Sequence, residues 1–286
     1  MVIFKSYSSA LRIGILFILG AVGLLSSPAK ADWSLLPESR HHLYQSYSFF
    51  IEQHNTIVSR GSNQFWAAVS ATLPIAGNND SPAHPQFLFH FSGNDSMHTD
   101  SNGGVYTETL DTRVGLLYEF SVPKAELQLS IGFLHESGHV ADGINSGDIA
   151  LFPTNLGLNV LRIRVLHDFD KTVRVGLTLD PITHSIPNAV ETGLNEFVEY
   201  FPWGSNEAEK YSPFVAAGLA HALSFSSAPL FHIQAGITLG AHFDPKHSTI
   251  GRLVYGYYTG PDPRAKYAEF LGGRSQFSYL GLMFCL

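Results

Sequence analysis

The sequence predicts an all-β protein, an antiparallel transmembrane β-barrel of about 12 strands, with ten strands as the alternative count. Three observations predict this fold. Side chains alternate between apolar and polar with a period of two, the alternating runs are about ten residues long, and charged residues make up only 14% of the chain. About ten residues is the length that a tilted strand needs to cross a bilayer. The alternation therefore favours strands with one side against lipid.

The amino terminus has the organisation of a secretory signal peptide. Lys5 and Arg12 precede an apolar run at 13–25, and the small-x-small triplet Ala29-Lys30-Ala31 follows. We expect a signal peptide over 1–31 and a single barrel domain over 32–286, with a retained membrane anchor as the alternative. No later stretch holds 18 consecutive apolar residues, so the exported chain has strands as its route across a membrane.

Two consecutive runs read as the first clear hairpin. Between 110 and 122 the even positions are mostly apolar and the odd positions are mostly charged or small. From 127 to 133 the apolar residues occupy the odd positions instead. Only Pro123, Lys124 and two further residues separate the runs, which is the length of a tight turn.

The pattern repeats along the chain. Leu161, Ile163 and Val165 alternate with Arg162 and Arg164, a turn follows at 168–171, and a second alternating run returns from 173 to 179. A later run at 231–240 alternates in the same way. We expect strands at 41–54, 64–75, 85–92, 107–122, 125–139, 158–167, 172–182, 194–201, 211–223, 228–242, 249–259 and 275–286.

The connections orient the barrel. Short turns belong on the periplasmic side of such barrels, so we place the links at 123–124 and 168–171 there, together with both termini. The Gly/Asn/Ser-rich stretch 92–104 is expected to be a surface loop. Some aromatic residues are candidates for interfacial girdles, although a core or loop role fits them as well. These are Trp66, Trp203, Tyr200, Tyr255, Tyr257 and Tyr258.

A soluble β-sandwich is the alternative fold, because its strands also alternate. Its outward face would carry the charges. Here the charges lie mainly in the connections and on the polar strand face, which lines the lumen of a membrane barrel. The predicted lumen residues are Arg113, Glu119, Arg162, Arg164 and Arg174. Their mixture of signs indicates a plugged or narrowly gated interior, serving either as a structural ion-pair ladder or as a substrate path.

Charge and cysteine content exclude several partners. Removing Lys5, Arg12 and Lys30 with the signal peptide leaves 14 basic groups against 24 acidic ones. A nucleic-acid partner needs a basic surface, so none is expected. Cys285 is the single cysteine, which excludes an intrachain disulfide and a thiolate metal cluster. We expect no cofactor.

His135-Glu136-Ser137-Gly138-His139 matches the H-E-x-x-H pattern of zinc proteases. That motif works on a helix, where residues four apart share a face. The preceding residues alternate with period two, and on a strand the two histidines would lie about 13 Å apart. We therefore predict no metal site here.

A strand instead places His135 and Ser137 on one side, pointing outward toward lipid headgroups. A base beside a hydroxyl is the minimum for an activated serine. The placement resembles that of outer membrane phospholipase A and the lipid A 3-O-deacylases, whose His-x-Ser pair would fall on His135 and Ser137. The resemblance implies an acyl hydrolase with Ser137 as nucleophile and His135 as general base. Gly138 stands where those families have Asn.

The third member of such a site is not assignable from the sequence, since Asn145 and Asn155 are merely near. The alternative is that these polar residues cap a strand at the headgroups.

A broader pattern covers residues 126–142 and the last 40 residues. Its elements are Phe133-Leu134-His135-Glu136-Ser137-Gly138-His139 with Asp142, Tyr257-Tyr258-x-Gly260-x-Asp262-Pro263, and Tyr279-Leu280-Gly281-Leu282-Met283-Phe284. These resemble the uncharacterised bacterial barrel family catalogued as domain of unknown function 1207. Gly138 replaces a second serine of that family, and Ala265-Lys266 replaces a Gly-Gln pair. The resemblance implies fold and location and no particular reaction.

The last strand also resembles the carboxy-terminal signal of the barrel assembly machinery, although the aromatic Phe284 comes two residues before the end. We expect an integral protein of the bacterial outer membrane. Its partners are outer-membrane lipid and, during biogenesis, that machinery. Its role is unassigned between a structural barrel, a lipid acyl hydrolase and a narrow pore or small-ligand binding barrel.

Overall fold

The computed structural model describes residues 34–35, 55–59, 64–78, 80–140, 156–169, 172–186, 192–203, 211–223, 229–239, 250–261 and 274–285. Ser34–Leu286 form one compact unit. Its strands are β1 (Ser34–Leu35), β2 (Asn55–Ser59), β3 (Gln64–Gly77), β4 (Gln86–Thr99), β5 (Val105–Val122), β6 (Leu127–Val140), β7 (Leu156–Phe169), β8 (Val173–Asp180), β9 (Ile182–Ile186), β10 (Gly193–Tyr200), β11 (Ser212–Ala222), β12 (Leu230–Leu239), β13 (Ile250–Pro261) and β14 (Arg274–Cys285). No helix among these residues is long and apolar enough to span a bilayer.

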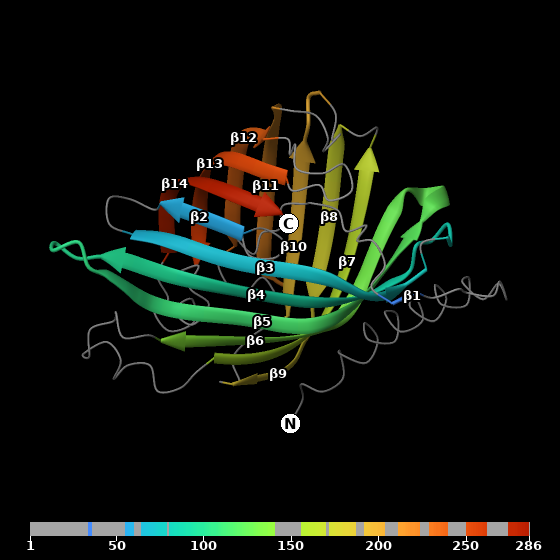
Figure 1. The fold of residues 1–286 in the computed structure, drawn as a ribbon, viewed down its shortest axis with the longest axis horizontal. Helices are drawn as coiled ribbons and strands as arrows, with labels where there is room; N and C mark the ends of the chain where they lie inside the picture. Colours follow the sequence, from blue (N-terminus) through green and yellow to red (C-terminus); the bar gives the residue numbers. More distant parts are fainter. Residues whose placement is uncertain are drawn as a thin grey trace. The chain divides into compact units, whose positions relative to one another are not determined.

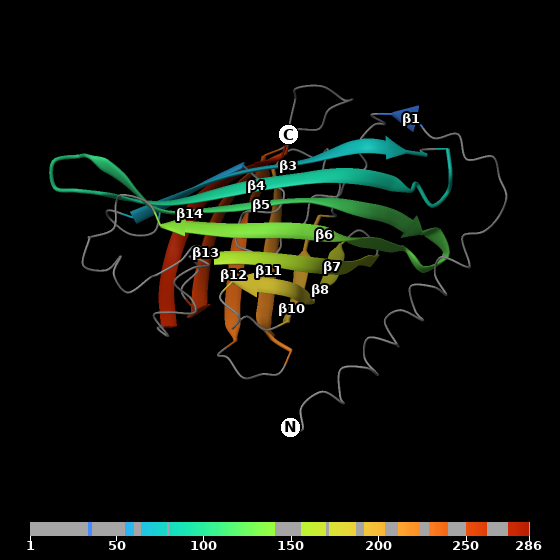
Figure 2. The same cartoon turned by 90° about the horizontal axis from the view of Figure 1, so that it is seen from below.

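All pairings are antiparallel and nearly all join neighbours in the chain. From β3 each strand pairs with the next through β8, then β10 pairs with β8, and the succession continues to β14. β14 pairs with β2, and β2 pairs with β3, so the succession returns to its starting strand. Twelve strands take part, while β1 and β9 are additions on β3 and β7. Figures 1 and 2 show the curved sheet from two directions.

The seam between β14 and β3, which β2 bridges, has the fewest paired residues in this ring of strands. β2 is five residues long, and it pairs with β3 over Thr56 to Ser59 and with β14 over five residues. Over the described residues the seam is therefore bridged along only part of the height of β3. The first residue of β2, Asn55, and the last residue of β14, Cys285, lie at the edge of the sheet that carries the turn Pro123–Ala125.

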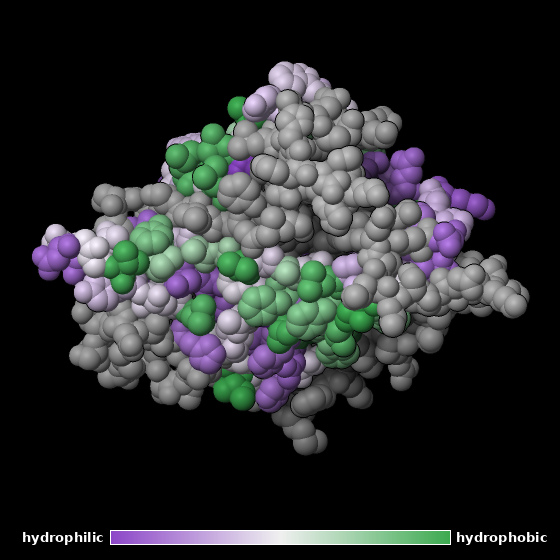
Figure 3. Space-filling view, in the orientation of Figure 1, coloured by the Kyte–Doolittle hydropathy of each residue, from purple (hydrophilic) through white to green (hydrophobic). Residues whose placement is uncertain are grey.

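The two faces of the sheet have opposite character. On β5 the side chains of Leu110, Val114 and Leu116 are exposed, whereas Asp111 and Glu119 are buried on the other face. The same holds on β4, where the phenylalanines at the alternate positions 87, 89 and 91 are all exposed. Figure 3 shows hydrophobic side chains gathered over the outer face of β3 to β5. An apolar exterior around a polar interior inverts the soluble β-sandwich, as expected where the exterior meets acyl chains.

The predicted fold class is confirmed, and most predicted strands agree with the observed ones to within a few residues. The predicted strand at 41–54 lies outside the described residues.

One loop prediction was wrong. Residues 92–99, expected in a surface loop, continue β4 and pair with β5 as far as Thr99–Val105. The polar residues at 92–99 do not alternate with large apolar residues, so their composition predicted a loop. The backbone there nevertheless continues to pair with β5.

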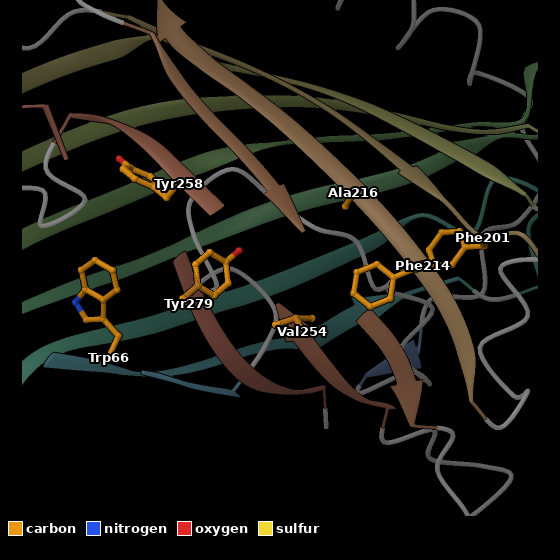
Figure 4. Packing of buried hydrophobic residues seen from close by; sticks show 7 residues of the cluster. All are labelled: Trp66, Phe201, Phe214, Ala216, Val254, Tyr258 and Tyr279. Carbon is orange, nitrogen blue, oxygen red and sulfur yellow. The ribbon is translucent and has the colours of Figure 1, made fainter. Parts of the chain in front are cut away.

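Part of the interior is filled by apolar and aromatic side chains. The cluster comprises Trp66, Phe201, Phe214, Ala216, Val254, Tyr258 and Tyr279. Figure 4 shows these side chains, which come from several strands of the sheet. Trp66 and Tyr258 were candidates for an interfacial girdle, and they are buried inside instead. Trp203, Tyr200 and Tyr255 are exposed. The face on which an aromatic side chain lies is decided by strand register, which composition does not report.

Candidate functional site

The H-E-x-x-H segment lies on β6 and is divided between the two faces of the sheet. His135 is exposed and lies on the outer face with Ser137 and His139, in the same alternation as the exposed Phe133. Glu136 lies on the inner face, where its Oε2 accepts a hydrogen bond from Nε of Arg113 at 3.0 Å. A strand cannot gather both imidazoles and the carboxylate on one metal ion. Over the described residues no group of three His, Cys, Asp or Glu side chains is placed to hold a metal ion.

Ser137 has polar neighbours along its own strand and on β5. Its Oγ lies 3.0 Å from Nε2 of His139. It also lies 3.1 Å from Oγ1 of Thr112, the residue directly opposite on β5. Ser137 and His139 are both half-buried. The hydroxyl is thus held in a hydrogen-bonded position on the face that meets lipid.

His135 has its partner on the other neighbouring strand. Its Nδ1 lies 2.8 Å from Oδ1 of Asn159, which is directly opposite on β7. The backbone of Asn159 is also bound from β9, because Oγ1 of Thr183 donates to the Asn159 backbone carbonyl oxygen at 3.0 Å. The sequence analysis did not identify Asn159. Asn145 and Asn155, which it named as merely near, lie outside the described residues.

The contact with Asn159 favours one tautomer of the imidazole. With Asn159 Oδ1 as the acceptor, the hydrogen of a neutral His135 ring lies on Nδ1 and the lone pair lies on Nε2. A histidine in this form, held by a neighbour and with a free basic nitrogen, is the form that a general base requires. Ser137 lies two residues away on the same face, so the outer surface of β6 and β7 carries a hydroxyl, an imidazole and an orienting amide.

The predicted lumen arginines lie on the inner face, and β7 and β8 position two of them. Arg162 is buried and donates from Nε to Oδ1 of Asp180 at 2.8 Å and from Nη2 to Oδ2 at 2.6 Å. Arg164 is buried beside it and donates from Nε to Oγ1 of Thr178 at 3.2 Å. The Arg162 guanidinium is matched by a two-point contact, which is the strongest geometry for this pair.

Arg174 belongs to a larger network. Its Nε lies 2.6 Å from Oδ1 of Asp168, and its Nη1 lies 3.6 Å from Oε2 of Glu199 on β10. Glu199 also contacts Nη1 of Arg252 on β13 at 3.2 Å. The Arg252 guanidinium lies over the ring of Phe214, 4.6 Å from its centroid. Charge and aromatic surface are thus joined across strands that are not neighbours in the sheet.

The other two predicted lumen residues lie on β5. Arg113 pairs with Glu136 as described, and Glu119 is buried on the inner face. The sequence analysis did not single out Asp168, Asp180, Glu199 or Arg252. The signal for Arg252 was present in its strand parity, since it precedes Leu253 in an alternating run in the same way as Arg162 precedes Ile163. Their partners follow from pairing across strands, which parity does not give.

Fold and faces together define a class of protein, the antiparallel transmembrane β-barrel with a lipid-facing exterior and a charged, partly filled interior. Known structures of this class resemble it. Outer membrane phospholipase A from Escherichia coli is 12% identical, covers 88% of this chain and 95% of its own, and superimposes with a TM-score of 0.56. The Salmonella typhi outer membrane phospholipase dimer with bound calcium is 11% identical, covers 88% and 97%, and has a TM-score of 0.57.

A third structure is an active-site mutant of the Escherichia coli phospholipase, with alanine in place of an asparagine. It is 12% identical, covers 93% of this chain and 96% of its own, and has a TM-score of 0.54. At such identities the likeness shows the fold alone. No protein-family model matches the chain, and no curated protein sequence does. The resemblance to domain of unknown function 1207 therefore stays a prediction.

Proposed function

We propose that this protein is an integral protein of the bacterial outer membrane. The apolar exterior, the secretory amino terminus predicted from the sequence and the outer-membrane proteins that share its fold support this location. Outer-membrane lipid is then its permanent neighbour. The assembly machinery for such barrels is its partner during biogenesis, which the outward alternation of Leu280 and Leu282 on β14 supports.

Within that membrane we propose that the barrel hydrolyses acyl esters of outer-leaflet lipid. The observation that carries this proposal is the contact between His135 and Asn159, beside a serine on the same lipid-facing surface. Nucleophile, base and orienting group are thereby present on two adjacent strands. A solved relative of the fold has an asparagine in its active site, which agrees with the role proposed for Asn159.

The reaction follows from the roles of these groups. Ser137 Oγ attacks the ester carbonyl carbon while its proton passes to Nε2 of His135, and the carbonyl electron pair moves to oxygen. When the tetrahedral intermediate collapses, the ester C–O bond breaks and the alcohol leaves with the proton from His135. Water, giving a proton to the same nitrogen, then attacks the acyl-serine carbonyl carbon. The bond from that carbon to Ser137 Oγ breaks, Oγ regains the proton from His135, and the fatty acid leaves.

Ser137 has two histidines on its strand, and Asn159 distinguishes them. In the structure the hydroxyl contacts His139, and the proposed reaction requires it to turn about the serine Cα–Cβ bond toward His135. His135 is the better base because Asn159 fixes its ring and its protonated nitrogen. His139 then holds the hydroxyl when no substrate is bound.

The test is fatty-acid release from phospholipid vesicles by the purified, folded protein. Ser137→Ala and His135→Ala are each expected to lower the rate by at least about 100-fold, and His139→Ala by much less. Ser278→Ala is the matched control, since Ser278 is exposed on the outer face of β14. Wild-type activity that survives Ser137→Ala would end the proposal, and a severe loss confined to His139→Ala would reassign the base.

A further inference from the structure

Ser137 is enclosed unequally on its two sides. On β5 its pairing partner is Thr112, whose hydroxyl is in contact with it. On β7 its pairing partner is Gly157, which has no side chain. Beyond Gly157, on β9, the paired residue is Ile186, whose side chain is exposed. The outer surface beside the serine is therefore bare at one position and apolar at the next.

Neither packing nor backbone conformation requires a glycine at 157. A Cβ built there meets no atom of the described residues within 4 Å. Other strand glycines differ, since a Cβ at Gly132 would lie 2.1 Å from the Leu116 carbonyl oxygen and one at Gly176 would lie 2.0 Å from the Phe197 ring. Gly157 is also absent from the positive-φ glycines of the described chain. Glycine weakens a strand, and close approach of a ligand or of another backbone is one reason for a glycine that neither packing nor a positive φ requires.

Resting on the acyl hydrolase proposed above, we propose that Gly157 is the position over which the acyl group of a long-chain ester lies when its carbonyl reaches Ser137. The chain then continues over apolar side chains, the exposed Ile186 on one side and the exposed Phe133 and half-buried Leu161 toward the membrane interior. Gly157 is thus a specificity-determining residue, and the substrate class is esters with long acyl chains. Short acyl groups need only the space immediately above the serine.

The experiment compares esters of different acyl length in mixed micelles of one detergent. Gly157→Val places a side chain beside Ser137 without a clash and suits a strand. We expect kcat/KM for p-nitrophenyl palmitate to fall by at least about ten-fold and that for p-nitrophenyl acetate to stay within about two-fold. The matched control is Gly93→Val. Gly93 lies on the far side of Thr112, and a Cβ there makes only an ordinary contact with Phe91 at 3.9 Å.

Each outcome decides the inference. Selective loss of palmitate hydrolysis in Gly157→Val, with Gly93→Val unchanged, supports it. Equal loss of both esters shows a distorted site, and unchanged hydrolysis of both shows that nothing passes over Gly157, so either result overturns it while the hydrolase proposal stands. If the wild-type protein cleaves neither ester nor phospholipid, the proposed function fails and the inference fails with it.

Discussion

Nδ1 of His135 on β6 lies 2.8 Å from Oδ1 of Asn159 on β7, and the two residues are 24 positions apart in the chain. This contact joins two strands on the surface that meets lipid. It gives the imidazole next to Ser137 a fixed orientation, which a polar strand cap at the headgroups does not need. The contact therefore favours chemistry over a purely structural role for this cluster.

Replacing Asn159 tests that distinction directly. Asn159→Ala removes the acceptor of the His135 Nδ1 hydrogen, so the ring can turn or take the other tautomer. We expect fatty-acid release to fall by at least about ten-fold. Asn159→Asp keeps an acceptor oxygen at the same place and is expected to retain most of the activity. An alanine variant as active as the wild type would show that Asn159 does not orient the base.

The buried carboxylate of Glu199 is expected to matter for stability. Glu199 has 0% of its surface exposed and lies between Arg174 and Arg252. Glu199→Gln leaves two buried guanidinium groups without this negative charge, which costs about 3–5 kcal/mol in the free energy of unfolding. Urea unfolding of the protein in phospholipid vesicles measures it. Glu196→Gln on the same strand is the control, because Glu196 is exposed and its loss should cost little. Equal effects of the two substitutions would contradict the network's role.

The lipid contact of the outer face predicts a depth-dependent cost for charge. Leu116 is 57% exposed near the middle of β5, and on a soluble protein Leu116→Arg would be nearly neutral. Within a bilayer it should destabilise the folded barrel by about 2–4 kcal/mol. Leu223→Arg, at the end of β11 and similarly exposed, should cost about 0–1 kcal/mol. The same unfolding assay reports both, and a harmless Leu116→Arg would argue against a membrane exterior.

The side chains that fill part of the interior predict a barrel that does not conduct. Arginine pairs, Arg252 over Phe214 and the aromatic cluster around Tyr258 occupy the space inside the strands. We expect the purified protein in planar bilayers to show no steady channels at moderate voltage. Steady single-channel openings would favour the pore alternative and would assign the lumen arginines to a conduction path.

Much of the fold was predictable from local pattern. The alternation around Leu110 to Val122 identifies strand, length and faces together, because successive side chains of a strand point to opposite sides. The parity of Arg162, Arg164 and Arg174 placed them on the polar face for the same reason. The extension of β4 to Thr99 was missed, since polar residues without apolar partners have the composition of a loop.

The sequence by itself determined most of the strands, the side that meets lipid where alternation is clear, and the presence of His135 and Ser137 on one surface. Only the tertiary structure decided that Asn159 stands opposite His135, that Gly157 stands beside Ser137 and that Glu199 reaches Arg252. The physical reason is that alternation is a property of the residues of a single strand, whereas these contacts depend on the register between strands. The register between β6 and β7 places the first two contacts, and barrel curvature brings β10 and β13 together.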